Sequence, residues 1–150
     1  MNKRARNEYY ALLVIVIPGL AACTPQAPQT LITIADARVN SAQLTDVGEP
    51  GDSAGDILVF DQPLRDEGMA EIGNNTGVCI RTRVEHSFQC QWTLTFENGS
   101  IQVAGRELDQ GTSTISIVGG TGIYAGIHGE MESTNNNDGT FTQILRYHIQ

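Results

Sequence analysis

Two charged residues have types and spacing that could support chemistry. Arg81 follows Cys79 by two positions in a predicted strand, so both side chains are expected on the same face. A guanidinium beside an apolar pocket would suit an enolate or carboxylate substrate. Glu107 is a candidate counter-ion for Arg81, or a general base. The alternative is that both side chains lie at the rim of the fold, in water.

Other patterns that carry chemistry are weak. The sequence shows no catalytic triad and no paired carboxylates, and His86, His128 and His148 lack the spacing of metal ligands. Gly120-Thr-Gly-Ile-Tyr-Ala125 has the outline of a dinucleotide fingerprint, which needs a helix after it and an acidic residue about twenty positions on. The residues that follow contain two more glycines and then a polar stretch, so they do not predict a helix. Neither a cofactor nor a metal is therefore expected.

Alternating apolar and polar residues predict the strands that would position these groups. The clearest pattern places Phe88, Cys90, Trp92, Leu94 and Phe96 on one face, with polar residues between them. Asn98-Gly99 then predicts a hairpin turn into the next strand.

About eight short strands are expected in total. They fall at residues 31–34, 57–60, 78–84, 88–96, 101–105, 115–118, 127–131 and 141–149. Residues 40–55 and 64–75 are rich in turn-forming residues and predict loops. Because no helical pattern stands out among the strands, the fold class is all-β, as a sandwich or a barrel.

The first 22 residues have the features of an export signal. Lys3, Arg4 and Arg6 precede an apolar run at residues 11–17, which is shorter than the ~20 residues that span a bilayer. Leu20-Ala-Ala-Cys23 resembles a bacterial lipobox, so lipidation of Cys23 is expected, with plain secretion as the alternative. Residues 23–30 would be a Pro-rich tether and residues 31–150 the folded domain. The expected protein is exported, and touches the membrane only through the lipid.

Removal of that signal would leave a strongly acidic chain. The whole chain has a net charge of −8, and the signal holds three basic residues and one acidic residue, so about −10 would remain. Such a charge repels phosphate backbones, and nucleic acid is not an expected partner. If Cys23 carries lipid, Cys79 and Cys90 remain as a pair, and an oxidising compartment favours a disulfide between them. Its short loop would contribute roughly 3 kcal/mol.

Several linked motifs carry a resemblance to a known superfamily. Val118-Gly-Gly-Thr-Gly-Ile-Tyr124, with Gly129 beyond it, resembles the glycine signature of plant dirigent proteins and allene oxide cyclases. Residues 55–60, 72–73, 77–79 and 101–105 follow the order and approximate spacing of the cyclase family. The resemblance covers residues 31–150. It implies a closed eight-stranded antiparallel β-barrel of the allene oxide cyclase/dirigent type, which is filled by side chains or holds one small ligand.

The same resemblance implies which residues face a ligand. Matching the cyclase motifs directs Leu58, Phe60 and Gln62 inward and places Cys79 near the substrate. The apolar face of Phe88, Trp92, Leu94 and Phe96 would also point inward. Together these residues describe an apolar cavity with few polar groups, as small-molecule sites have. The alternative is that they only fill the core.

The sequence differs from the cyclases at the positions of their catalytic residues. The family has an acidic residue and an asparagine on its first strand, where Thr33 and Ala35 stand here, and the adjacent Asp36 is predicted to face the other way. A family proline is absent near Ala42, and Glu107 replaces a tyrosine. True allene oxide cyclase activity is therefore not expected, and a disulfide would remove the Cys79 thiol from any reactive role.

The resemblance implies a cofactor-free cyclase or isomerase. It would bind a reactive apolar molecule, derived from a polyketide or a fatty acid, and guide its ring closure by holding it in a reactive conformation. The alternative is a non-catalytic exported lipoprotein that binds apolar ligands or has a structural role in the envelope. Self-association is left open.

Overall fold

The computed structural model describes residues 27–40 and 42–150, and all its regular elements are strands. The strands are β1 (Gln29–Asp36), β2 (Gln43–Thr45), β3 (Ile57–Arg65), β4 (Glu71–Arg83), β5 (Ser87–Phe96), β6 (Gly99–Leu108), β7 (Thr112–Gly122), β8 (Ile127–Asn135) and β9 (Thr140–Ile149). The expected export signal and the lipidation of Cys23 fall outside the described residues.

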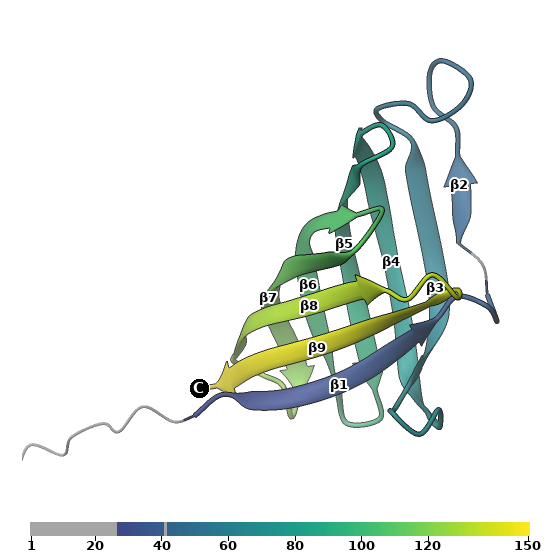
Figure 1. Cartoon of the computed structure of the whole chain (residues 1–150). Helices are drawn as coiled ribbons and strands as arrows, with labels where there is room; N and C mark the ends of the chain where they lie inside the picture. Colours follow the sequence, from purple (N-terminus) through teal and green to yellow (C-terminus); the bar gives the residue numbers. More distant parts are fainter. Residues whose placement is uncertain (1–26, 41) are drawn as a thin grey trace, which may run out of the picture.

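Eight of these strands close into an antiparallel barrel (Figure 1). They follow one another in the order β1-β9-β8-β7-β6-β5-β4-β3, and β1 pairs with β3 where Ile34 lies opposite Arg65 and Ala35 opposite Leu64. Farther along β3, the short strand β2 takes the place of β1 as its partner. The predicted all-β class and closed eight-stranded barrel are confirmed.

A buried aspartate is paired with two arginines where the barrel closes. Asp36 is 2% exposed, and its carboxylate accepts hydrogen bonds from Arg38 Nε at 2.7 Å and from Arg65 Nε at 2.8 Å. These two guanidinium groups hold the pKa of Asp36 well below its usual range. Because Arg65 belongs to β3, the contact fastens the end of β1 to the strand that completes the barrel.

Residues 64–75 differ from the predicted loop. They contain the end of β3 and the start of β4, joined by a tight turn in which Ala70 N donates to Asp66 Oδ1 at 2.9 Å. Leu64 is fully buried and Asn75 is 3% exposed. The polar composition suggested turns, but pairing of β4 with both β3 and β5 overrides that local preference.

The long connection before β3 is organised by one buried carboxylate. Asp56 is fully buried and accepts hydrogen bonds from the backbone N–H groups of Val47 and Ser53, both at 2.9 Å. These hydrogen bonds lower its pKa. The predicted loop, as far as the structure describes it (residues 40 and 42–55), therefore contains an ordered excursion and the short strand β2.

The interior has a packed half and a hollow half. In the packed half, Leu94, Ile101, Ile115, Met131 and Leu145 are fully buried, one from each of β5 to β9. The aromatic rings of Phe96, Tyr124 and Tyr147 follow one another beside them, with ring centroids 5.5 and 6.4 Å apart. Other inward positions on β5, β6, β8 and β9, together with positions on β1, β3 and β4, surround a cavity.

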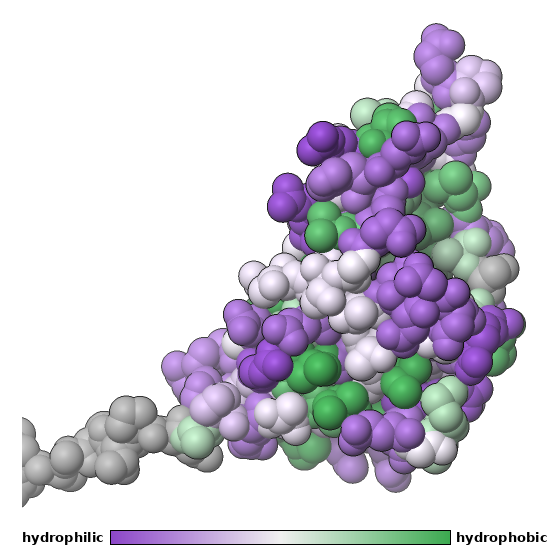
Figure 2. Space-filling model, in the orientation of Figure 1, coloured by the Kyte–Doolittle hydropathy of each residue, from purple (hydrophilic) through white to green (hydrophobic). Residues whose placement is uncertain are grey.

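The face of the molecule seen in Figure 2 is mainly hydrophilic, with apolar residues between the polar ones. Val59, Val78 and Ile80 are examples of outward-facing apolar side chains on β3 and β4, each more than 40% exposed. In the described part of the chain, no helix is long and apolar enough to cross a membrane.

Candidate functional site

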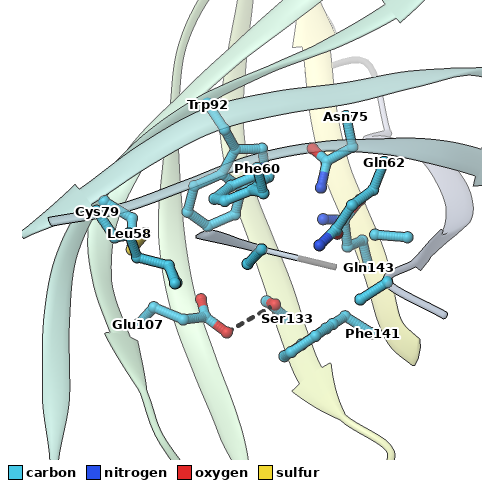
Figure 3. Close-up of a pocket in the computed structure, with 14 residues that line it drawn as sticks. Leu58, Phe60, Gln62, Asn75, Cys79, Trp92, Glu107, Ser133, Phe141 and Gln143 are labelled. Atoms are coloured by element: carbon cyan, nitrogen blue, oxygen red, sulfur yellow. Dashed lines mark hydrogen bonds between the residues drawn. A yellow bond between two sulfur atoms is a disulfide. The ribbon is translucent and has the colours of Figure 1, made fainter. Parts of the chain in front are cut away.

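The cavity has a volume of about 280 Å³ and lies in the hollow half of the barrel (Figure 3). Side chains from β1, β3, β4, β5, β6, β8 and β9 and from the connection after β1 reach it. Its lining consists of Ala35, Ala37, Ala42, Leu58, Phe60, Gln62, Asn75, Cys79, Cys90, Trp92, Glu107, Ser133, Phe141 and Gln143. This size suits a compact organic molecule.

Aromatic and aliphatic side chains form most of the walls. Phe60 and Trp92 meet edge to face, with ring centroids 6.3 Å apart. Leu58 and Phe141 add further apolar surface, and the sulfurs of Cys79 and Cys90 are joined in a disulfide across β4 and β5. The thiol of Cys79 is therefore not free to react.

Gly77 makes room for the two aromatic rings. It is the strand partner of both Phe60 and Trp92. A Cβ atom at this position would overlap Trp92 Cβ and would lie 2.7 Å from Phe60 Cζ and 2.8 Å from Gln91 O. The missing side chain thus lets both rings lie against the backbone of β4.

We expect Gly77→Ala to deform the cavity and to lower the free energy of unfolding by about 1–3 kcal/mol, because the added methyl group overpacks this wall. Urea unfolding followed by Trp92 fluorescence measures the loss. Gly119→Ala is the matched control, since a Cβ at Gly119 meets nothing within 4 Å. Equal stability of the two variants would contradict the role given to Gly77.

Three buried amides supply polar groups to the same cavity. Gln62 and Asn75 are opposite each other on β3 and β4, and Gln143 projects from β9. The Thr33 hydroxyl donates to Gln143 Oε1 at 2.9 Å, which leaves the Gln143 Nε2 hydrogens free to donate to a ligand. Asn75 Oδ1 is buried without a partner. Amides placed in this way can hydrogen-bond the polar edge of a bound molecule.

Glu107 provides the acidic group of the cavity. It lies across the cavity from Gln62 and Asn75, and its Oε1 accepts a hydrogen bond from Ser133 Oγ at 2.9 Å (Figure 3). Its other oxygen, Oε2, is buried and unpaired. Burial raises the pKa of Glu107 to about 7, and hydrogen bonds from Ser133 and Ser113 only partly oppose this effect. The carboxyl can therefore give or accept a proton near neutral pH.

Arg81 does not reach this cavity, contrary to the prediction. Its Nε lies 2.7 Å from Asp52 Oδ1, and its Nη1 donates to both carboxylate oxygens of Asp109 at 2.7 and 2.8 Å. The guanidinium also lies 3.7 Å from the centre of the Phe88 ring. Arg81 is thus paired with two acidic residues at one end of the barrel, and it is not the counter-ion of Glu107.

Three predicted apolar contacts also lie elsewhere. Phe88 packs under Arg81, Leu94 is fully buried in the packed half, and Phe96 packs against Tyr124. All three share a face of β5 with Trp92, but the cavity extends along only part of that strand. The structure does bring the remaining candidates to the cavity, namely Leu58, Phe60, Gln62, Cys79, Trp92 and Glu107.

Sequence reasoning missed Asn75, Ser133, Phe141 and Gln143. A signal for them exists, because each occurs in phase with inward residues of its strand, as Gln143 does between Phe141 and Leu145. A polar residue in phase with a buried apolar face indicates a lined cavity or a buried hydrogen bond. Of the residues on β1, Ala35 lines the cavity and Thr33 orients Gln143, whereas Asp36 is not part of the lining.

The described residues contain no group of three or more histidine, cysteine, aspartate or glutamate side chains placed to hold a metal ion. Among the residues that the structure describes, the lining includes no basic side chain that could bind the phosphate of a cofactor. The polar groups that the described lining offers are the Glu107 carboxyl, three amides, the Ser133 hydroxyl and the unpaired Trp92 indole N–H.

Comparison with known proteins gives one family and several similar structures. The model of the family described as "Dirigent-like protein" matches residues 25–150. A structure of a pyocyanin demethylase is 25% identical, with a TM-score of 0.70, and the match covers 80% of this chain and 100% of that chain. None of the curated proteins matches significantly.

Two more distant structures share the fold. A pterocarpan synthase dirigent protein is 17% identical, with a TM-score of 0.62 and coverage of 95% of this chain and 99% of that one. A Diels-Alderase from Streptomyces koyangensis is 18% identical, with a TM-score of 0.64 and coverage of 81% of this chain and 64% of that one.

Proposed function

The chain belongs to the dirigent-like protein family, and from this premise we propose that its barrel binds a compact, largely apolar molecule and guides its isomerisation or ring closure. The observation that carries the proposal is the Glu107 carboxyl, which faces an apolar cavity with one oxygen unpaired. A buried carboxyl with an unpaired oxygen lowers the stability of the fold. A catalytic role for Glu107 therefore explains its position better than a structural role does. The cyclases and dirigent proteins with the same fold support this class of reaction.

The proposed step is a proton transfer within one substrate. The Glu107 carboxylate removes a proton from a carbon next to a carbonyl group, and the electron pair moves onto the carbonyl oxygen. Amide hydrogens of Gln62, Asn75 or Gln143 stabilise the negative charge that develops there. The protonated carboxyl then returns the proton at another atom, or the enolate closes a ring by attacking an electrophilic carbon and the proton is returned to the product. No co-reactant is consumed.

The cavity also restricts the shape of the substrate. Phe60, Trp92 and Phe141 leave about 280 Å³, so a flexible chain must fold to fit. Holding the reacting atoms together removes part of the entropic barrier to ring closure. The proposed substrates are polyketide-derived or fatty-acid-derived compounds. Incubating such compounds with and without the protein, and comparing the products, tests for rearrangement.

A second candidate reaction is removal of a methyl group from a ring nitrogen of a conjugated cation. Water would add to the methyl carbon, which would leave as formaldehyde, and the two electrons released would reduce the conjugated ring. This reaction is favoured by the likeness to the pyocyanin demethylase structure, which the match covers completely while it covers 80% of this chain. Mass spectrometry of the same incubations separates the two reactions, because an isomerised product keeps the mass of its substrate and a demethylated product does not.

We expect Leu58→Trp to block the cavity and to abolish binding of an apolar fluorescent probe such as N-phenylnaphthylamine. Leu58 lines the cavity, and the larger ring would occupy the ligand's space. The emission of the probe measures binding. Val78→Trp is the matched control, because Val78 is 42% exposed and lies on the outer face of β4.

The control variant and the native protein should bind the probe alike. If the native protein bound no probe at any concentration, the proposed ligand cavity would be rejected. The non-catalytic lipoprotein with a structural role would then be the better proposal. Binding without any product from the substrate panel would favour a ligand carrier.

A further inference from the structure

In the part of the chain that the structure describes, the cavity has an acidic side chain but no basic side chain to balance it. Among the described residues, Glu107 is the one lining side chain that can carry a charge, since Cys79 and Cys90 are joined in a disulfide. Arg81, the nearest basic candidate from the sequence, is neutralised by Asp52 and Asp109. A bound anion would therefore meet a carboxylate and no balancing cation.

The strands packed against Glu107 supply no charge either. Its strand partner on β5 is Phe88, and its Oε1 receives a hydrogen bond from Ser133 Oγ of β8. The nearby residue of β7 is Ser113, whose hydroxyl is also uncharged. The side chains of Leu58 on β3 and Cys79 on β4 lie on the same side of the cavity as Glu107, and neither carries a charge (Figure 3). The charged residues nearest to Glu107 on its own stretch of chain are Arg106, which is exposed, and Asp109, which is paired with Arg81.

We propose that the cavity selects a compact conjugated ligand that carries a delocalised positive charge, and that it excludes isosteric carboxylates. The inference rests on the proposed function, because it concerns the ligand of the same cavity. It narrows that ligand to conjugated compounds with a positive charge, and it excludes those fatty-acid-derived compounds that keep a free carboxylate. A cation beside Glu107 would compensate the unpaired carboxylate oxygen. The π-faces of Phe60, Trp92 and Phe141 attract the same charge. The amides of Gln62, Asn75 and Gln143 can hydrogen-bond a polar edge of the ring system.

Ligand charge and the proton on Glu107 are then coupled. The empty cavity favours the protonated carboxyl, because burial raises the pKa of Glu107 to about 7. A bound cation favours the ionised form, so its binding releases a proton. The apparent affinity for a cation should follow the ionised fraction of Glu107, falling about tenfold from pH 8 to pH 6. The affinity for an uncharged isostere should not fall in this way.

Three two-ring probes of similar shape test the proposal: N-methylquinolinium as the cation, methylnaphthalene as the uncharged compound and naphthoate as the anion. Binding to the native protein and to Glu107→Gln is measured by quenching of Trp92 emission at pH 6 and pH 8, with calorimetry for proton release. At pH 8 we expect N-methylquinolinium to bind about tenfold more tightly than methylnaphthalene, and naphthoate to bind least. Glu107→Gln should remove both the preference and its pH dependence.

Glu130→Gln is the matched control, because Glu130 is exposed on β8, and it should behave like the native protein. If methylnaphthalene or naphthoate bound as tightly as the cation at pH 8, the charge selectivity would be refuted while the ligand cavity stood. Failure of all three probes to bind would instead reject the proposed function itself.

Discussion

Glu107→Gln is expected to lower turnover of a substrate rearranged in the barrel by about a hundredfold to ten-thousandfold, which is the usual contribution of a positioned acid or base. Glutamine has nearly the same shape as glutamate, and it can still accept the hydrogen bond from Ser133 Oγ. It cannot exchange a proton near neutral pH. Steady-state rates for a substrate found in the incubation screen measure the loss, and circular dichroism verifies the fold.

The pH profile of the native protein shows which role Glu107 has. An ordinary glutamate, with a pKa near 4.5, would be almost wholly ionised at pH 7, whereas burial raises the pKa of Glu107 to about 7. If the ionised carboxylate acts as the base, kcat/KM should rise with pH and level off above about pH 7. If the protonated carboxyl acts first as an acid, kcat/KM should fall across the same range. Either dependence should be absent from Glu107→Gln.

Glu130→Gln is again the control, because it removes an exposed carboxylate from the same protein without touching the cavity. It should retain the native rate and pH profile. If Glu107→Gln kept more than a tenth of the native rate, Glu107 would not be the acid–base group. Catalysis would then have to come from confinement of the substrate alone.

The sequence predicted the inward faces well because strand alternation depends on local pattern. Trp92 belongs to the clearest alternating run, and Leu58, Phe60 and Gln62 follow from the resemblance to the cyclases. All four line the cavity. Because side chains alternate along a strand, the two-residue period shows which residues share a face of the sheet. In this barrel the apolar face points into the interior.

Position along the barrel axis could not be predicted in the same way. Arg81 was expected beside the cavity because it follows Cys79 by two residues, but the barrel ends there, and Asp52 and Asp109 approach from separate loops. Leu94 shares the face of Trp92, yet it lies in the packed half. How far a hollow extends depends on the volumes of side chains from seven strands, which no single strand reveals.

The amides show a different limit. Asn75 lies in a polar stretch that predicts turns, and it enters the cavity only because this part of β4 pairs with both β3 and β5. The cross-strand pairing of Asn75 with Gln62 requires the register of the two strands. Long-range register is set by the assembled sheet, so local composition was misleading at this site.

Glu107→Gln is also expected to stabilise the protein at pH 8 by about 2–3 kcal/mol, although it removes activity. Burial raises the pKa of Glu107 in the folded state to about 7, from 4.5 in the unfolded chain. Between these values, the folded protein holds a proton that the unfolded chain has released. The contribution of Glu107 to the free energy of unfolding therefore falls as the pH rises through this window, and it is constant above and below it.

Urea unfolding of the native protein and of Glu107→Gln at pH 4.5 and pH 8, followed by Trp92 fluorescence, measures this effect. Other titrating groups contribute equally to both proteins, so the difference between them reports Glu107 alone. We expect similar stabilities at pH 4.5 and a more stable variant at pH 8. Glu130→Gln should show no such difference between the two pH values, because its carboxylate is exposed in both states.

Opposite effects of one substitution on stability and on turnover would separate a functional carboxyl from a structural one. A structural carboxyl stabilises the fold that contains it, and its loss destabilises the protein at the pH where it is charged. A carboxyl that is kept for chemistry can instead be replaced with a gain in stability. If Glu107→Gln were less stable than the native protein at pH 8, the ionised Glu107 would be well satisfied in the folded state, and its assignment as the acid–base group of an apolar cavity would fail.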